Sequence, residues 1–287
     1  MFAITAITGR VGGALATTLL ARGENVRAVV RDAAKGEPWK KRGAEIAIAN
    51  ADDAGALTRA FTGVDGVFVL LPPNFAPSPG FPESTKQVSA FRDALVAAAP
   101  PKVVVLSTVG AQHATDIGIL RSLWFLEQEL GSLPMPVTFL RAAWFMDNAE
   151  WDVGPARETG TIASFLQPLD RAIPMIAAAD VGTTAADLLL ETWSGKRVVE
   201  LAGTSVSPND IAGSLGRALG RSVVAYAVPR ATWKETFVDQ GTAWPEPRIA
   251  MLDGFNSGWI AFEGGSAERR HGTTTFDEVA RRLVQQT

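Results

Sequence analysis

The sequence predicts an α/β protein built on a doubly wound parallel sheet, and three observations support this prediction. The chain has 287 residues, of which 47% are hydrophobic and 20% charged, so it can bury a sizeable core. Its first half alternates short apolar runs with longer helical patterns, as right-handed strand–helix–strand crossovers do. A glycine-containing turn follows the first apolar run, where a nucleotide-binding sheet places its phosphate loop.

Six strands are expected in the first half, because their residues are nearly continuously apolar, as in strands covered by helices on both faces. They are residues 2–7, 25–31, 44–49, 65–71, 102–108 and 136–141. Helical patterns lie between them, at residues 10–22, 35–42, 53–61, 83–98 and 117–130. We therefore expect a dinucleotide-binding domain over residues 1–150.

The regular alternation stops in the second half of the chain. A helix is expected over residues 180–193, with Asp180 as its N-cap. A short strand follows over residues 198–203. We expect residues 151–287 to form a smaller α/β substrate lobe that is partly interleaved with the first domain, with helix 180–193 packing back on the large sheet.

Two later helices and one loop carry explicit end signals. Ser207 followed by Pro208 predicts an N-cap with proline at the first helical position. Thr275 and Glu278 have the spacing of a capping box ahead of a final amphipathic helix. The segment 72–82 contains five prolines, so it is expected to be a long irregular loop, and such loops often carry function.

Composition argues against several classes of function. A net charge of −3 with dispersed basic residues offers no electrostatic attraction for nucleic acid. Because the chain has no cysteine and only two histidines, thiolate metal sites are excluded and a metal enzyme is not expected. No apolar run approaches the ~20 residues of a membrane span, and the start lacks a basic signal region. We expect a cytoplasmic protein, either a monomer or a homo-oligomer.

The stretch AITAITGRVGG, residues 3–13, is the strongest local motif. It runs from the first strand into the first helix, the context of a Rossmann-type phosphate loop, whose backbone N–H groups bind phosphate. The alternative is a strand-to-helix turn with no ligand. Ala6 stands where the first glycine is usual; a positive φ there would cost alanine about 1–2 kcal/mol. The candidate pyrophosphate residues are Thr8, Gly9, Arg10, Val11 and Gly12.

The end of the second strand indicates which dinucleotide is favoured. An acidic residue there binds the ribose 2′-hydroxyl of NADH, whereas an arginine suits the 2′-phosphate of NADPH. Arg31 occupies this place, and Lys35 follows nearby. These cations favour NADPH over NADH. The alternatives are that both are solvated surface charges and that Asp32 binds the ribose.

Several motifs recur together along the first part of the chain. They are ITAITGRVGGALATTLLARG, VRAVVRD, residues 64–68 with 71–72, residues 105–110, Glu127 with Leu130, and residues 140–148. Together they resemble the NmrA-like family of atypical short-chain dehydrogenases/reductases. The chain departs from the family at Ala6 and at Ala142, where glycine and proline are usual. The resemblance implies a Rossmann fold, NADPH, and reduction of quinones or azo compounds. It also implies an alternative, because some members bind dinucleotides without turnover as redox-sensing regulators.

The usual catalytic pair of short-chain dehydrogenases is missing. These enzymes donate a proton from a tyrosine whose pKa is lowered by a lysine four residues later. With Glu127 aligned to the family's glutamate, Ile119 and Leu123 stand at those positions, and the only tyrosine is Tyr226. Alcohol oxidation and epimerisation by that route are therefore not expected. A conjugated acceptor can still take hydride and collect its proton from water.

The remaining candidates follow the ends of the sheet strands, where a doubly wound sheet binds ligands. Leu71, Pro72, Ser107 and Thr108 are expected to flank the nicotinamide. His113 is the candidate proton donor, because imidazole exchanges protons near neutral pH; a solvent-facing loop histidine is the alternative. The candidates for the site of a small planar aromatic substrate are Trp144, Phe145, Asn148 and Trp151, where the aromatic side chains would stack on it; core packing is the alternative for each tryptophan.

We therefore expect an NADPH-dependent reductase that transfers hydride to a planar conjugated acceptor, a quinone or an azo compound, without a Tyr/Lys pair. The rival prediction is a non-catalytic NADP(H)-binding, redox-sensing regulator.

Overall fold

The computed structural model describes residues 1–287 and is built on one eight-stranded sheet. The strand order is β3-β2-β1-β4-β5-β6-β10-β13, and all neighbouring strands are parallel. The order reverses between β1 and β4, so the predicted doubly wound Rossmann sheet is confirmed. The strands are β1 (Phe2–Ile4), β2 (Val26–Val30), β3 (Glu45–Ile48), β4 (Gly66–Val69), β5 (Val103–Thr108), β6 (Val137–Ala142), β10 (Lys196–Ala202) and β13 (Glu268–His271).

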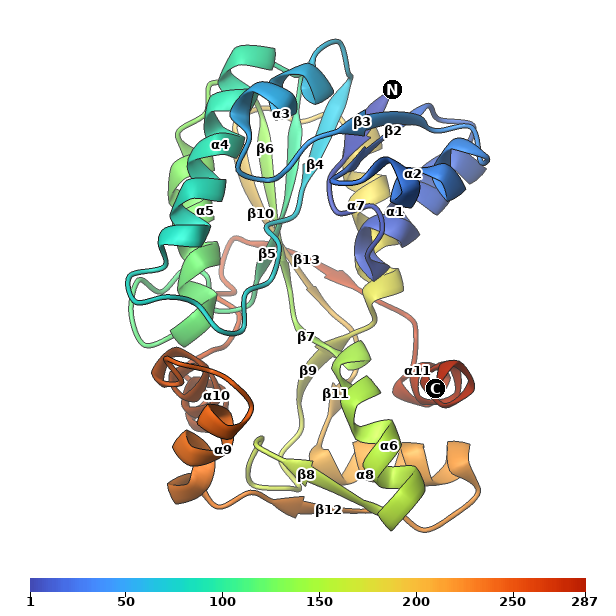
Figure 1. Cartoon of the computed structure of the whole chain (residues 1–287), viewed down its shortest axis with the longest axis vertical. Helices are drawn as coiled ribbons and strands as arrows, with labels where there is room; N and C mark the ends of the chain where they lie inside the picture. Colours follow the sequence, from blue (N-terminus) through green and yellow to red (C-terminus); the bar gives the residue numbers. More distant parts are fainter.

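Helices cover both faces of this sheet (Figure 1). One face carries α3 (Ala54–Phe61), α4 (Pro82–Ala98) and α5 (Arg121–Gly131), and the other α1 (Arg10–Ala21), α2 (Ala33–Lys40) and α7 (Ala178–Leu190). Helices α1 and α7 pack closely because Gly182 has no side chain: a Cβ there would lie 2.7 Å from the Val11 carbonyl oxygen. Each face buries its own apolar cluster.

The ends of the predicted elements differ from the observed ones for local reasons. The first strand ends at Ile4 rather than at residue 7, because Ala6 has a left-handed backbone with φ 51°. Helix α2 begins at Ala33, two residues early, because the Asp32 side chain caps it. The helix expected at 117–130 starts as a 3-10 turn, η1 (Gly118–Leu120), before α5.

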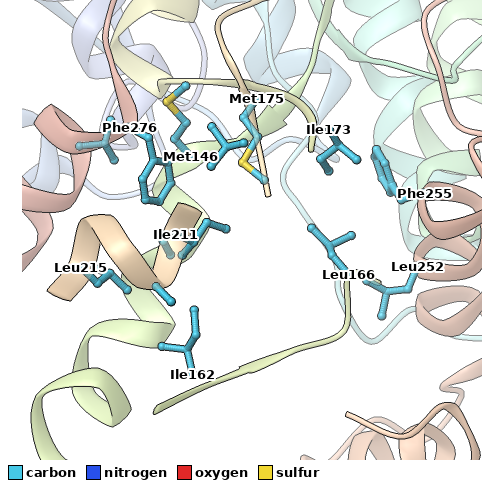
Figure 2. Close-up of a cluster of buried hydrophobic side chains, with 14 of the residues drawn as sticks. Met146, Ile162, Leu166, Ile173, Met175, Ile211, Leu215, Leu252, Phe255 and Phe276 are labelled. Atoms are coloured by element: carbon cyan, nitrogen blue, oxygen red, sulfur yellow. The ribbon is translucent and has the colours of Figure 1, made fainter. Parts of the chain in front are cut away.

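A second group of elements lies beyond the carboxyl ends of the central strands, in the lower half of Figure 1. It encloses a separate apolar core in which Met146, Ile162, Leu215 and Phe276 meet (Figure 2). Its elements are β7 (Trp144–Phe145), η2 (Met146–Ala149), α6 (Glu150–Thr159), β8 (Thr161–Ser164), β9 (Ile173–Ile176), β11 (Ser205–Val206), α8 (Pro208–Leu219), β12 (Val224–Ala227), η3 (Arg230–Thr232), α9 (Trp233–Asp239), α10 (Glu246–Ser257) and α11 (Phe276–Gln286).

The end signals of the second half are mostly confirmed. Capping boxes begin α8 at Ser207 and α11 at Thr275. The prediction of Asp180 as an N-cap is wrong: α7 begins two residues earlier, and the Asp180 carboxylate accepts hydrogen bonds from the backbone N–H and hydroxyl of Thr274, at 2.9 and 2.7 Å. The backbone N–H of Ala178, at the start of α7, donates instead to the carboxylate of Asp147 in η2.

The chain returns to the large sheet after residue 150. The strand expected at 198–203 is β10, which pairs with β6, and β13 forms the edge beyond it. Helix α7 packs against α1 (Figure 1). The second half of the chain therefore supplies two strands, β10 and β13, to the eight-stranded sheet and one helix, α7, that packs on it. The division of the chain at residue 150 stays a prediction.

Candidate functional site

The turn between β1 and α1 forms a cradle of backbone groups. Gly9 is the N-cap of α1, but no side chain caps the helix and no acidic residue lies in its first turn. The Gly9 N–H donates to the Ala6 carbonyl oxygen at 2.9 Å, and a Cβ on Gly12 would lie 2.4 Å from that oxygen. Because the first-turn N–H groups lack a capping side chain, the positive end of the helix is available to an anion.

Ala6 adopts the backbone conformation that glycine usually has at this position of the turn. Its φ is 51°, in the left-handed region where glycine is the usual residue. The tight turn thus keeps the glycine geometry at a cost of about 1–2 kcal/mol for alanine. Thr8 and Gly9 are exposed at the tip of the turn, whereas Val11 and Gly12 are buried beneath it.

The side chain of Arg10 is engaged by carboxylates from the second group of elements. Its guanidinium forms an ion pair with Glu150 of α6 at 2.8 Å, and its Nε lies 3.8 Å from Asp147 of η2. Asp147 is buried, accepts from Arg282 of α11 at 2.6 Å, and also accepts from the N–H of Ala178 at 2.8 Å. Asp147 therefore joins the starts of α1 and α7 to the last helix.

Two cations stand unpaired at the end of β2. Arg31 and Lys35 are exposed and form no ion pair. The Oδ1 atom of Asp32 accepts from the Ala34 N–H at 2.9 Å, so this oxygen caps α2. The corner expected to discriminate between dinucleotides thus presents positive charge.

The proline-rich loop after β4 reaches the second group of elements at two points. It begins with Leu71, which is buried, and Pro72, which is partly buried. Phe75 packs edge-on against Trp151 of α6, with ring centroids 5.9 Å apart. Phe81 packs against Trp244 at 5.4 Å. Trp151 remains 63% exposed, so most of its indole is open to a ligand.

A buried ionic network lies beside the ends of β5 and β6. The Ser107 hydroxyl donates to Glu127 at 2.5 Å, and Arg141 donates two hydrogen bonds to the same carboxylate at 2.9 and 2.7 Å. Arg141 also donates to Glu263 at 2.6 Å. Burial opposes the charge of Arg141, but these carboxylates outweigh it and raise the pKa of its guanidinium. Ser107 is turned into this network, while the Thr108 hydroxyl makes no hydrogen bond within the chain.

The aromatic residues after β6 have different surroundings. Trp144 packs edge-on against Phe255 at 4.9 Å and borders the second core, which fits the packing alternative for this residue. Phe145 borders the core under α1. Asn148 is partly buried, and its side chain forms no hydrogen bond. Phe145 and Asn148 thus remain candidates for the acceptor site.

His113 lies on the loop that follows β5. Its ring stacks on Trp259, with centroids 4.0 Å apart and planes at 26°. Its Nε2 atom lies 3.2 Å from Nε2 of Gln112. A cavity of about 170 Å³ opens beyond the ends of β5 and β6; its lining includes Val109, Ala143, Phe255, Ile260 and Ala261. A more open hollow of about 390 Å³ lies at the opposite end of the sheet, where β10 begins.

Sequence reasoning did not assign roles to three residues that complete this region. Asp147 lies inside the motif shared with the NmrA-like family, so its place in the chain was a usable signal. Gln112 and Glu263 lie in loops with no motif, and only the tertiary structure brings them to the strand ends. Tyr226 lies on β12, at the bottom of Figure 1, away from the large sheet. None of the helices combines the length and the apolar surface needed to cross a membrane.

The strand order, the glycine cradle and the crevice at the strand ends define a Rossmann-type α/β protein. The chain belongs to the NmrA-like family, whose sequence profile matches residues 2–250. It is 26% identical to an NAD(P)H azoreductase of Xenophilus azovorans over 84% of this chain and 82% of that protein. It is 25% identical to quinone oxidoreductase 2 of Escherichia coli (strain K12) over 78% of this chain and 76% of that protein.

Solved structures share the whole fold. The triphenylmethane reductase of Citrobacter sp. superposes with a TM-score of 0.81 at 20% identity, covering 99% of each chain. An NADPH-dependent quinone oxidoreductase of Escherichia coli, complexed with NADPH, superposes with a TM-score of 0.79 at 22% identity, again over 99% of each chain. At this level of identity the likeness establishes the fold.

Proposed function

We propose that this protein is an NADPH-dependent reductase that transfers hydride to a planar conjugated acceptor, a quinone or an azo compound, without a Tyr/Lys pair. The observation that carries the proposal is the uncapped start of α1 above Gly12, at the carboxyl edge of the switch between β1 and β4. Pyrophosphate would bind there, because the backbone N–H groups of the first turn have no capping side chain.

The residues around the cradle would divide the work of holding NADPH. Thr8 to Gly12 would hold the pyrophosphate through backbone groups, and the unpaired Arg31 and Lys35 would bind the 2′-phosphate. Leu71, Pro72 and Thr108 would flank the nicotinamide. In this proposal Ser107 acts indirectly, through Glu127, because its hydroxyl is already engaged.

The acceptor would lie among aromatic side chains. Phe145, Asn148 and the exposed Trp151 would border it, while Trp144 supports the wall by packing against Phe255. A flat ring system suits stacking on an open indole face. The azoreductase and quinone oxidoreductase among the relatives support this class of acceptor.

The proposed reaction requires little from the protein beyond the correct positioning of the cofactor and the acceptor. NADPH, when bound, supplies a hydride; a quinone takes the hydride with its two electrons and one proton from water, giving the quinol and NADP⁺. The chain would contribute by orienting both partners and excluding water from the contact between them. His113 would assist at the acceptor.

The test is NADPH oxidation across a panel of quinones and azo dyes, with cofactor binding followed in parallel by tryptophan fluorescence. A reductase consumes NADPH with at least one acceptor. Binding of NADP⁺ and NADPH without oxidation by any acceptor would instead support a redox-sensing regulator, the alternative that the family allows.

The 2′-phosphate assignment has its own test. Arg31→Ala is expected to weaken NADPH binding about tenfold, the effect of about 1.4 kcal/mol, and to leave NADH binding nearly unchanged. Lys41→Ala, at an exposed cation beyond the end of α2, is the matched control and should leave both affinities unchanged. An equal loss for NADPH and NADH in Arg31→Ala would overturn the assignment.

A further inference from the structure

The side-chain amide of Gln112 connects His113 to a backbone carbonyl of a distant segment. Its Nε2 donates to the carbonyl oxygen of Ala261 at 2.9 Å and lies 3.2 Å from His113 Nε2. A carbonyl oxygen can only accept, so it determines which end of the amide faces it. Turning the amide over would place two oxygens 2.9 Å apart. The NH₂ end therefore faces both Ala261 and the histidine.

The orientation of this amide dictates where the imidazole carries its hydrogen. The NH₂ group donates, so His113 Nε2 has to accept, and a neutral ring that accepts at Nε2 carries its hydrogen on Nδ1. The Oε1 of Gln112 is buried and meets no donor in the chain, so no other side chain competes for the orientation of the amide. Stacking on Trp259 holds the ring in place, and the backbone N–H of His113 donates to the Gly110 carbonyl oxygen at 3.0 Å, which fixes the loop that carries it.

Gln112 links this ring to the lining of a cavity. Ala261, which orients the amide, also lines the cavity beyond the ends of β5 and β6, and so does its neighbour Ile260. Nδ1 of His113 forms no hydrogen bond within the chain, and the ring is only partly buried. In the Nδ1–H tautomer the ring thus has one N–H donor without a partner in the chain, and Gln112 connects the ring to the cavity-lining Ala261.

We infer that Gln112 is a positioning residue that holds His113 as the neutral Nδ1–H tautomer, so that Nδ1–H donates a hydrogen bond to the oxygen or azo nitrogen of the acceptor. The catalytic half of this inference rests on the proposed function. A neutral imidazole stabilises negative charge developing on an acceptor atom without giving up its proton. The new O–H or N–H bond then takes its proton from water, and His113 ends the step unchanged.

Nitrogen-15 NMR of histidine-labelled protein above neutral pH reads the tautomer directly. The chain has only two histidines, so His271 is an internal reference and His113→Phe assigns the spectrum. We expect the Nδ1–H pattern for His113. In Gln112→Met, which removes the donor at similar volume, we expect the ring to change to mainly the Nε2–H form, the preferred tautomer of a free imidazole.

Kinetics test the catalytic half. Gln112→Met and His113→Phe are each expected to lower kcat with the best acceptor about tenfold, the loss of one hydrogen bond to a charged group, with the KM for NADPH unchanged. Gln286→Met, at an exposed glutamine of α11, is the control and should match the unmodified protein.

Each result decides one half of the inference. An Nε2–H pattern in the unmodified protein, or an unchanged tautomer in Gln112→Met, overturns the role of Gln112. An Nδ1–H pattern with unchanged kcat in His113→Phe overturns the donor role. If no acceptor is reduced at all, the proposed function fails together with the donor role, whereas the NMR result still decides the tautomer.

Discussion

Replacing Ala6 by glycine should stabilise the protein, although it removes a methyl group. Ala6 has φ 51°, and an L-residue with a side chain pays about 1–2 kcal/mol in that region. Glycine removes this cost but loses about 0.5–1 kcal/mol more backbone entropy on folding. The difference leaves a net gain of about 0.5–1 kcal/mol in the free energy of unfolding for Ala6→Gly.

Helix α4 provides both controls for this prediction. Ala99 is its C-cap, with φ 47° and an exposed side chain, so Ala99→Gly should stabilise by a similar amount. Ala97 is exposed inside the same helix, where glycine costs about 1 kcal/mol, so Ala97→Gly should destabilise. The same substitution is thus expected to act with opposite sign two residues apart.

Urea unfolding followed by far-UV circular dichroism measures these differences as shifts of the midpoint at constant slope. The midpoint is expected to rise in Ala6→Gly and Ala99→Gly and to fall in Ala97→Gly. If Ala6→Gly lowers the midpoint as much as Ala97→Gly does, the turn does not hold residue 6 in the left-handed region, and the account of the cradle is wrong.

Two further stability predictions concern buried charges. Burial raises the pKa of Asp152 to about 7 from an unfolded value near 3.8, so ionisation in the folded state removes stability as the pH rises from about 4 to 7. The free energy of unfolding of Asp152→Asn should therefore equal that of the unmodified protein at pH 4 and exceed it by about 1–2 kcal/mol at pH 8. This gain is smaller than the unscreened ~4 kcal/mol because the carboxyl is partly exposed. A difference in urea unfolding that stays constant with pH would contradict this. Arg141→Met should cost about 3–5 kcal/mol because it leaves Glu127 buried without its partner. The control Arg230→Met, in an exposed pair, should cost under about 1 kcal/mol, and equal losses in thermal unfolding would refute the distinction.

Local patterns predicted the first half of the fold because the information is local there. Each strand from β1 to β6 is an apolar run between helical patterns, and short crossovers impose parallel order and handedness. The capping boxes at Ser207 and Thr275 were also readable, because cap and partner lie three residues apart. The failure at Asp180 has the opposite cause: its partner, Thr274, is 94 residues away.

The candidate site likewise has one part that the sequence predicts and another that depends on the tertiary structure. The glycine turn, the cations after β2 and the strand-end residues follow from position within a βα unit, so the sequence predicts them. The engagement of Arg10 by Asp147 and Glu150, and of Ser107 by Glu127, depends on elements that meet only in three dimensions. No spacing in the sequence encodes such contacts.

By itself the sequence determined the doubly wound sheet, the place of the glycine turn and the fact that the single tyrosine, Tyr226, has no lysine four residues after it, since periodicity and residue identity suffice for these. Only the tertiary structure decided the sign of φ at Ala6, the return of β10 and β13 to the large sheet, and the contact of Gln112 with Ala261. The physical reason is that a backbone dihedral, an edge pairing and a side-chain contact with a distant carbonyl are set by which groups far apart in the chain pack together.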